Sequence, residues 1–376
     1  RINKMASHRS AATADLNFLK DYVVCHGTAP EHTTSYGGRT FHQQDEGLTD
    51  WKDKFEIKIV EIAEDDMVFD MSGIDVAFAN AFRRILQAEV PTMAIEKVFV
   101  RNNTGVLRDE LLAHRLGLIP IKADPSRFDW PSKETKKADH TSPLNENEVL
   151  KFKLHVKCRK PPAGGQEPIN GKVLSSALEW VPIGGQEAGF VSDRPEPVSA
   201  DILIARLRPG QELELEAHCH KGSNLGERGH AKWSPVATAW YRLLPRIDLV
   251  EEVTGPLAEA LVSKCASGCF EIEDLAAPAP ARRARVSDDK ERDCTLCREC
   301  VREPALARKV RVARAKAHFI FSVESTGILP PAELFRQSVT ILRSKAAGLL
   351  DALEQLEGTM AVDAMEADGN DDEDEE

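Results

Sequence analysis

The chain has 376 residues, of which 42% are hydrophobic, so it is long enough for two or three domains with sizeable cores. Its formal net charge is −12, but nine acidic residues and no Lys or Arg lie between 363 and 376, and without that tail the remaining chain carries only −3. A nearly neutral body lacks the clustered excess of Lys and Arg that nucleic-acid binding requires, which argues against a free-standing DNA-binding regulator.

No stretch approaches the roughly 18 apolar residues of a membrane-spanning helix, so no membrane contact is expected. The N-terminus lacks the apolar core of a secretory signal, and Met5 is compatible with a natural start. Without such a signal, the eight cysteines are expected to be thiols or ligands in a reducing compartment rather than disulfides.

The first part of the chain is predicted to be an arm followed by a hairpin. Residues 1–51 are polar and rich in Gly, His, Thr and Ser, which is typical of an extended or partly disordered N-terminal arm. Phe55, Ile57 and Ile59 then alternate with charged residues, which is the period of a half-buried strand. Residues 67–71 are expected to form its hairpin partner.

An amphipathic helix is predicted between Gly73 and Pro91. Asp75 can cap its start through its carboxylate, and Pro91 should end it near residues 87–89. The apolar side chains that share one face at helical spacing are Phe78, Phe82, Ile85 and Leu86. The polar side chains off that face are Asn80, Arg83 and Arg84.

Residues 93–245 are predicted to be mostly β-structure with loops. Strands are indicated at 95–100 and, by strict alternation, at 152–158 and 213–219. A short helical face is formed by Leu107, Leu111, Leu112 and Leu116, and a polar loop is expected over 124–143. His218 and His220 share the polar face of the last strand with three glutamates, so they are expected to be solvated rather than a metal-binding pair.

Residues 246–312 are predicted to form a small module that holds five of the eight cysteines. Three of them follow a C-x2-C-x2-C pattern, which can surround an iron–sulfur cluster: Cys294, Cys297 and Cys300. The position of the fourth ferredoxin-type ligand is occupied by Pro304, although Cys265 or Cys269 could complete a four-sulfur site for iron–sulfur or zinc. Because the segment lacks the fourth cysteine at the expected position, no cofactor is favoured. Free thiols in a degenerate ferredoxin-like module are expected.

A strand at 319–323 and a turn at 327–331 lead into a long closing helix, predicted over 332–357. Its apolar residues repeat as a heptad seam, made of Phe335, Val339, Leu342, Ala346, Leu349, Leu353 and Leu356. Such a long stripe favours a helix-on-helix subunit interface over a purely internal core. Residues 359–376 are predicted to be a disordered acidic tail.

No enzyme motif is present. The sequence contains no G-x-S-x-G elbow, no G-x-x-x-x-G-K-[ST] loop, no G-x-G-x-x-G turn and no H-E-x-x-H zinc helix. The chain is therefore predicted to have no catalytic residues of its own.

Four segments, in order between about 55 and 357, resemble one family. They are DVAFANAFRRIL at 75–86, LRDELLAHRLGLIP at 107–120, GHAKWSPV with YRLLP at 229–245, and HFIFSVESTGILPP at 318–331. They resemble the alpha-like subunits of multisubunit RNA polymerases, in particular the larger alpha-like subunit shared by eukaryotic RNA polymerases I and III. Residues 122–131 lack the cysteines of the polymerase II counterpart, which argues against that subunit. The cysteines at 265–300 leave an archaeal-type subunit with an iron–sulfur module as one alternative. An independent iron–sulfur or redox protein is the other alternative.

This resemblance implies an α+β fold in which a split dimerisation domain, a sheet plus two helices at 52–92 and 313–358, is interrupted by other parts. A β-rich insertion domain at 93–245 and the cysteine module at 246–312 would lie between its halves. The resemblance also implies a non-catalytic assembly subunit that pairs with a smaller alpha-like subunit, carries the two largest subunits and contacts small assembly subunits. It would contact DNA only through the other subunits of the complex. The resemblance further implies that the complex transcribes ribosomal and small RNAs in the nucleus, including the nucleolus.

The resemblance assigns two groups of site residues. The implied dimer interface consists of Phe78, Phe82, Ile85, Leu86, Phe335, Val339, Leu342, Ala346, Leu349 and Leu353. The implied contacts with a large subunit are Asn80, Arg83 and Arg84, because guanidinium groups can hold carboxylates or carbonyls, and the alternative for them is a solvated polar face.

Overall fold

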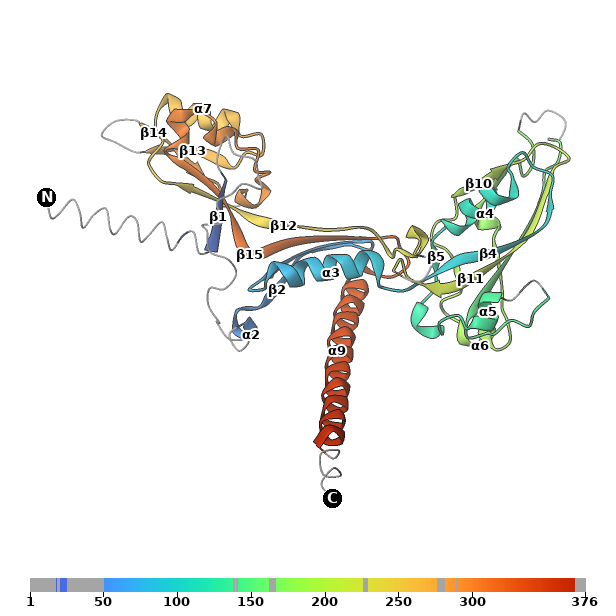
Figure 1. Ribbon diagram of the computed structural model, residues 1–376. Helices are drawn as coiled ribbons and strands as arrows, with labels where there is room; N and C mark the ends of the chain where they lie inside the picture. Colours follow the sequence, from blue (N-terminus) through green and yellow to red (C-terminus); the bar gives the residue numbers. More distant parts are fainter. Residues whose placement is uncertain are drawn as a thin grey trace, which may run out of the picture. The chain divides into compact units, whose positions relative to one another are not determined.

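The computed structural model describes residues 18, 21–25, 51–137, 139, 141–161, 167–225, 229–275, 281–288 and 290–368 (Figure 1). It confirms the predicted α+β class. The chain divides into two compact units. The first contains the described residues up to Glu61 with Val68–Ala79 and Trp240–Ser322, and the second contains Ile62–Met67, Asn80–Ala239 and the chain from Val323 onward. The boundaries of these units fall inside single strands and helices, so they do not test the predicted domain boundaries, which stay a prediction.

The first unit is built on a five-stranded sheet. Its strands are β1 (Tyr22–Cys25), β2 (Glu56–Ile62), β3 (Asp66–Ser72), β12 (Val236–Leu249) and β15 (Val310–Ser325). The order is β1-β15-β3-β2, and β12 also pairs with β15. Phe69 and Phe321 stack in the core with ring centroids 5.2 Å apart, and Tyr241 lies 5.2 Å from Phe321. The predicted hairpin and return strand are therefore confirmed.

Two strands of this sheet differ from the prediction. β1 lies inside the predicted N-terminal arm and pairs antiparallel with β15, with Tyr22 opposite Ala315; most of the remaining arm lies outside the described residues. β2, which is preceded by the short helix α2 (Trp51–Lys54), was predicted to be half-buried, yet all seven of its residues are exposed. The prediction was wrong because β2 is the last strand of the sheet.

The cysteine module also belongs to the first unit. Helix α7 (Pro256–Lys264) packs with the antiparallel pair β13 (Phe270–Leu275) and β14 (Ala281–Val286). Three short helices follow: η5 (Glu291–Asp293), η6 (Glu299–Val301) and α8 (Pro304–Ala307). Residues 281–285 have the basic sequence ARRAR, and Arg283 on β14 pairs with Glu273 on β13 at 2.6 Å, so part of this charge is neutralised within the module.

The second unit contains the β-rich insertion, built on a four-stranded sheet in the order β4-β11-β6-β8. These strands are β4 (Thr92–Asn103), β11 (Glu212–Gly222), β6 (Val149–Lys157) and β8 (Glu179–Val181). Two small pairs accompany them: β5 (Ile121–Lys122) with β9 (Glu196–Pro197), and β7 (Lys172–Leu174) with β10 (Leu203–Arg206). The core of this sheet includes Leu112, Leu116, Phe152, Leu154, Leu213, Leu215 and Cys219. The predicted strands are confirmed.

The helices of the insertion are short. α4 (Asp109–Gly117) confirms the predicted helical face, since Leu112 and Leu116 are fully buried, although Leu111 is exposed. The segment predicted as a polar loop at 124–143 contains η2 (Pro125–Arg127) and α5 (Lys133–Lys137). The others are η3 (Ser175–Ala177), α6 (Gln186–Gly189) and η4 (Ala231–Trp233).

The histidines of β11 are buried, so the prediction of a solvated polar face was wrong. His218 and His220 are each only 3% exposed, because β11 lies between β4 and β6 and the segment around α5 covers this face. The neighbouring carboxylate of Glu216 is neutralised by Lys151 at 2.7 Å and Arg101 at 2.8 Å. Burial lowers the pKa of both histidines to about 4, so both rings are neutral at pH 7.

Two helices complete the fold. α3 (Val76–Ala88) confirms the predicted opening helix, and its start is capped as expected, because the Asp75 carboxylate accepts the Ala77 N–H at 2.7 Å.

α9 (Pro331–Asp368) follows a turn in which Gly327 has a φ of +83°. α9 continues to Asp368 instead of ending at Glu357, so the predicted disordered tail at 359–376 is helical up to that residue, and 369–376 lie outside the described residues. No helix in the described residues is long and apolar enough to span a membrane.

Candidate dimerisation site

The start of α9 is anchored on α3 within the second unit. Leu334 is fully buried, and the half-buried ring of Phe335 lies 5.4 Å from the ring of Phe82. Lys345 adds an ion pair with Glu89, just after the end of α3, at 2.6 Å. These contacts fix the direction in which α9 leaves α3, and Figure 1 shows that only its first turns lie beside α3.

The remainder of α9 exposes the apolar seam. Val339 is 43% exposed, and the leucines of the later turns are between 56% and 68% exposed: Leu349, Leu350, Leu353 and Leu356. Ala346 is exposed as well, and Leu342 is half-buried. An α-helix of 38 residues is about 57 Å long, so most of the seam lies beyond the turns of α9 that pack on α3. A continuous exposed apolar stripe of this kind is typical of a subunit interface.

The apolar face of α3 is divided between the core and the surface. Ile85 and Leu86 are at most 2% exposed, and Phe82 is covered by Phe335, so these side chains belong to the core of this chain. Phe78, on the first turn, is 52% exposed. Of the four α3 residues assigned to the interface, only Phe78 presents a large surface to another protein, because the other three are buried within this chain.

The polar residues of α3 also separate into two roles. The guanidinium of Arg83 donates to the Asn80 side-chain oxygen at 2.9 and 3.0 Å and to the Gln87 side-chain oxygen at 3.1 Å. Gln87 in turn donates to the Ala239 carbonyl at 2.9 Å. Arg84 is exposed. Arg83 and Asn80 therefore fix each other, and Arg84 is the side chain of the three that is available to a partner.

Strand β2 adds an exposed apolar surface that the sequence reasoning missed. Ile57, Ile59, Val60 and Ile62 are between 44% and 58% exposed. Val60 interrupts the alternation with an apolar residue on the opposite face, and this signal could have identified a strand with apolar side chains on both faces. An edge strand with exposed aliphatic side chains needs a cover, since its unpaired backbone groups invite strand addition.

The cysteine module brings several of its thiols into one core. Cys269, Cys294 and Cys300 are buried, Cys265 accepts the Cys269 N–H at its sulfur at 3.3 Å, and Cys297 is exposed. Burial raises the pKa of all three buried thiols, that of Cys300 to about 12. In the described part of the chain, no group of three or more His, Cys, Asp or Glu side chains is arranged to hold a metal ion. Whether the five cysteines bind iron–sulfur or zinc stays a prediction.

Comparison with known proteins identifies the family. The RNA polymerase Rpb3/Rpb11 dimerisation domain matches residues 68–346. The chain is 43% identical over 358 residues to human DNA-directed RNA polymerases I and III subunit RPAC1, covering 92% of this chain and 99% of the human protein. It is 40% identical over 303 residues to the yeast RPAC1 of Saccharomyces cerevisiae, covering 79% and 87%. It is 33% identical over 307 residues to DNA-directed RNA polymerase subunit Rpo3 of Methanosphaera stadtmanae, covering 80% and 99%.

The chain belongs to the Rpb3/Rpb11 dimerisation family of RNA polymerase subunits. This confirms the resemblance inferred from the four sequence segments and makes the chain a non-catalytic subunit of a polymerase complex. Membership in this family also accounts for the exposed seam of α9, because a dimerisation domain requires a partner. The matched region ends at residue 346, and the leucines from Leu349 onward lie beyond it.

Proposed function

We propose that this chain is the assembly subunit shared by RNA polymerases I and III, and that it pairs through α9 with a smaller alpha-like subunit. The resulting heterodimer would carry the two largest, catalytic subunits and contact small assembly subunits. The high identity to proteins named as shared subunits of polymerases I and III supports this class over the archaeal-type alternative. Transcription of ribosomal and small RNAs by these enzymes would place the chain in the nucleus, including the nucleolus.

The observation that carries the proposal is the exposed seam of α9. Burying one leucine of this kind contributes about 1.5–3 kcal/mol before the costs of ordering and association. The exposed leucines from Leu349 to Leu356 therefore supply a substantial part of the free energy of a helix-on-helix contact with a second apolar helix. A helix with this seam has no comparable cover within the described residues of its own chain.

The proposal is tested by purifying the tagged full chain from its native cell and identifying its companions by mass spectrometry. We expect two large polymerase subunits and one smaller alpha-like subunit, and the identity of the large subunits defines the polymerase class. Leu353→Asp should remove the smaller alpha-like subunit, because a carboxylate would then be buried in the seam.

The matched control is Val191→Asp, which places the same charge at another highly exposed apolar residue outside α9. This variant should retain every companion. A full complement of subunits with Leu353→Asp would refute the interface assigned to α9, whereas recovery of the chain without any polymerase subunit would refute the proposed function.

The cysteine module stays a separate question. An independent iron–sulfur protein would require four ligands, which the five cysteines of this module would have to supply. The prediction that no metal is favoured remains a prediction, and analysis of iron, zinc and acid-labile sulfide in the purified chain tests it. Stoichiometric iron with visible absorbance would contradict it.

A further inference from the structure

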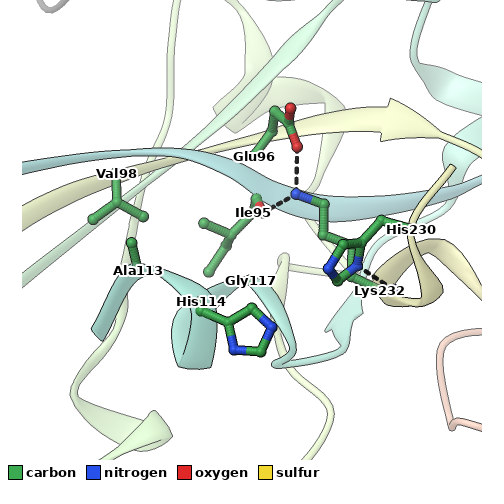
Figure 2. Close-up of a pocket in the computed structure, with 8 residues that line it drawn as sticks. All are labelled: Ile95, Glu96, Val98, Ala113, His114, Gly117, His230 and Lys232. Atoms are coloured by element: carbon green, nitrogen blue, oxygen red, sulfur yellow. Dashed lines mark hydrogen bonds and ion pairs between the residues drawn. The ribbon is translucent and has the colours of Figure 1, made fainter. Parts of the chain in front are cut away.

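A cavity in the insertion domain brings together two of the sequence segments described above. Its volume is about 210 Å³, and β4, α4 and the segment at 230–232 enclose it (Figure 2). The lining residues are Ile95, Glu96, Val98, Ala113, His114, Gly117, His230 and Lys232. Gly117 permits this close packing, since an added Cβ would lie only 3.3 Å from the Ile95 carbonyl oxygen.

The charged groups of this cavity already balance each other. The Lys232 ammonium pairs with the Glu96 carboxylate, donates to the Ile95 carbonyl at 3.1 Å and lies 4.4 Å from the centre of the Trp233 ring. Figure 2 shows the Lys232 ammonium beside the Glu96 carboxylate and the Ile95 carbonyl. What remains for a ligand is the pair of imidazole rings and the apolar wall.

The two imidazoles are placed to act together as hydrogen-bond donors. The Nδ1 atom of His230 accepts the backbone N–H of Lys232 at 3.1 Å, so in the neutral ring the proton resides on Nε2, which is a donor. The ring of His114 lies 6.0 Å from the ring of His230 at an interplanar angle of 71°. In the described part of the chain, the His114 ring nitrogens have no hydrogen-bond partner, and His114 is exposed.

We propose that this cavity, defined by His114 and His230, binds the carboxylate of an Asp or Glu side chain from a neighbouring polymerase subunit. Two imidazole N–H groups can donate to the two oxygens of one carboxylate. The apolar wall of Ile95, Val98 and Ala113 matches the methylene stem of such a side chain.

The size of the cavity supports a single side chain. Pockets that hold drug-sized molecules or cofactors have volumes of about 300–1,000 Å³, so 210 Å³ is too small for them. A metal ion is not supported, because no set of three or more ligand side chains is suitably arranged in the described residues. A cationic side chain would meet the Lys232 ammonium and two proton donors.

The inference rests on the proposed function, because it requires the chain to be in a polymerase complex. The test uses the tagged full chain with a photo-crosslinking amino acid at Glu110, an exposed position one turn from His114 on α4. After irradiation of the native complex, mass spectrometry should identify a peptide of another subunit with an Asp or Glu close to the crosslink. The same amino acid at the exposed Ile169 serves as the control position and should not yield that peptide.

The acidic residue of that peptide is then changed to Asn or Gln, which should abolish most of the crosslink. His114→Asp should have the same effect by charge repulsion, and combining it with a lysine at the partner's acidic position should restore the crosslink. Val191→Asp, at an exposed residue of the insertion outside the cavity, is the control and should leave the yield unchanged.

Two results would overturn the inference while leaving the proposed function intact. One is a complete polymerase complex in which Glu110 gives no crosslink to another subunit. The other is a crosslink whose yield does not change when the nearby acidic residue is neutralised. Purification of the chain without any polymerase subunit would instead refute the proposed function, together with the inference that depends on it.

Discussion

Two buried histidines make the stability of the insertion domain dependent on pH. Both His218 and His220 have a pKa of about 4 in the folded chain, whereas an unfolded histidine has a value of about 6.5. Between these values the unfolded state binds more protons than the folded state, so stability decreases as the pH falls. The stabilising effect of the neutral rings is complete above about pH 6.5 and is lost progressively toward pH 4.

We therefore predict that unfolding by urea requires less denaturant at pH 5 than at pH 7.5. The free energy of unfolding should fall by about 2 kcal/mol for each of the two histidines over this interval. The variant with His218→Gln and His220→Gln should lose most of this dependence, because glutamine does not titrate. His155→Gln, at an exposed site, is the control, and an equal loss of pH dependence in that variant would contradict the assignment.

The two neighbouring arginines of α3 should respond differently to substitution. Arg84 is exposed, so Arg84→Glu is expected to weaken recruitment of the large subunits without affecting pairing with the smaller one. Arg83→Ala should instead lower the free energy of unfolding by about 1 kcal/mol, because Arg83 holds the side chains of Asn80 and Gln87. Subunit ratios in purified complexes measure the first effect and urea unfolding the second. Undiminished recruitment with Arg84→Glu would refute its role.

At the scale of elements, the sequence predicted those that follow a clear period. The spacing of Phe78, Phe82 and Ile85 located α3, and Asp75 and Pro91 located its ends within a few residues. Heptad spacing located α9, but its end was predicted eleven residues too early, because the acidic residues after Glu357 were interpreted as a disordered tail. Acidic residues such as Asp363 and Glu366 are compatible with a helix once an anchored segment precedes them.

The remaining errors concern burial, which depends on neighbours distant in sequence. Alternation correctly placed His218 and Glu216 on one face of a strand, but it did not reveal that α5 covers that face. In the same way, the period of β2 indicated a strand without indicating its position at the sheet edge. For the candidate site, the sequence identified the seam, whereas only the structure separated Phe78 from the buried Phe82 and Ile85.

The later turns of α9 should determine pairing strength. Removing residues 347–376 deletes four exposed leucines but keeps the contacts of Phe335 with Phe82 and of Lys345 with Glu89. We expect this variant to fold and to pair with the smaller subunit at least 100-fold more weakly, since the loss of two buried leucines already corresponds to about 3 kcal/mol. Affinity measured by titration calorimetry provides the test. Removing only 369–376 is the control and should leave pairing unchanged.

At the scale of the whole molecule, the net charge of the chain differs from the positive excess that is typical of proteins that bind nucleic acid directly. Much of its net charge of −12 resides in the segment 363–376, and the remainder is close to neutral. Several basic side chains are also paired within the chain, for example Arg283 with Glu273 and Lys151 with Glu216. Because the net charge of the chain gives no excess of positive charge to release counterions from a DNA backbone, we expect contact with DNA to depend on the other subunits of the complex.

The chain without other subunits should therefore fail to bind duplex DNA at physiological salt. Non-specific DNA-binding proteins bind under these conditions with a Kd of about 10⁻⁴–10⁻⁶ M, and we expect no saturation in that range by fluorescence anisotropy. Deleting 363–376 is the decisive second variant, because it removes nine acidic residues that could mask a basic surface. This deletion should not produce binding, since the remaining net charge is still −3. Tight, salt-dependent binding by the shortened chain would show that a local basic surface outweighs the net charge and would support direct DNA contact.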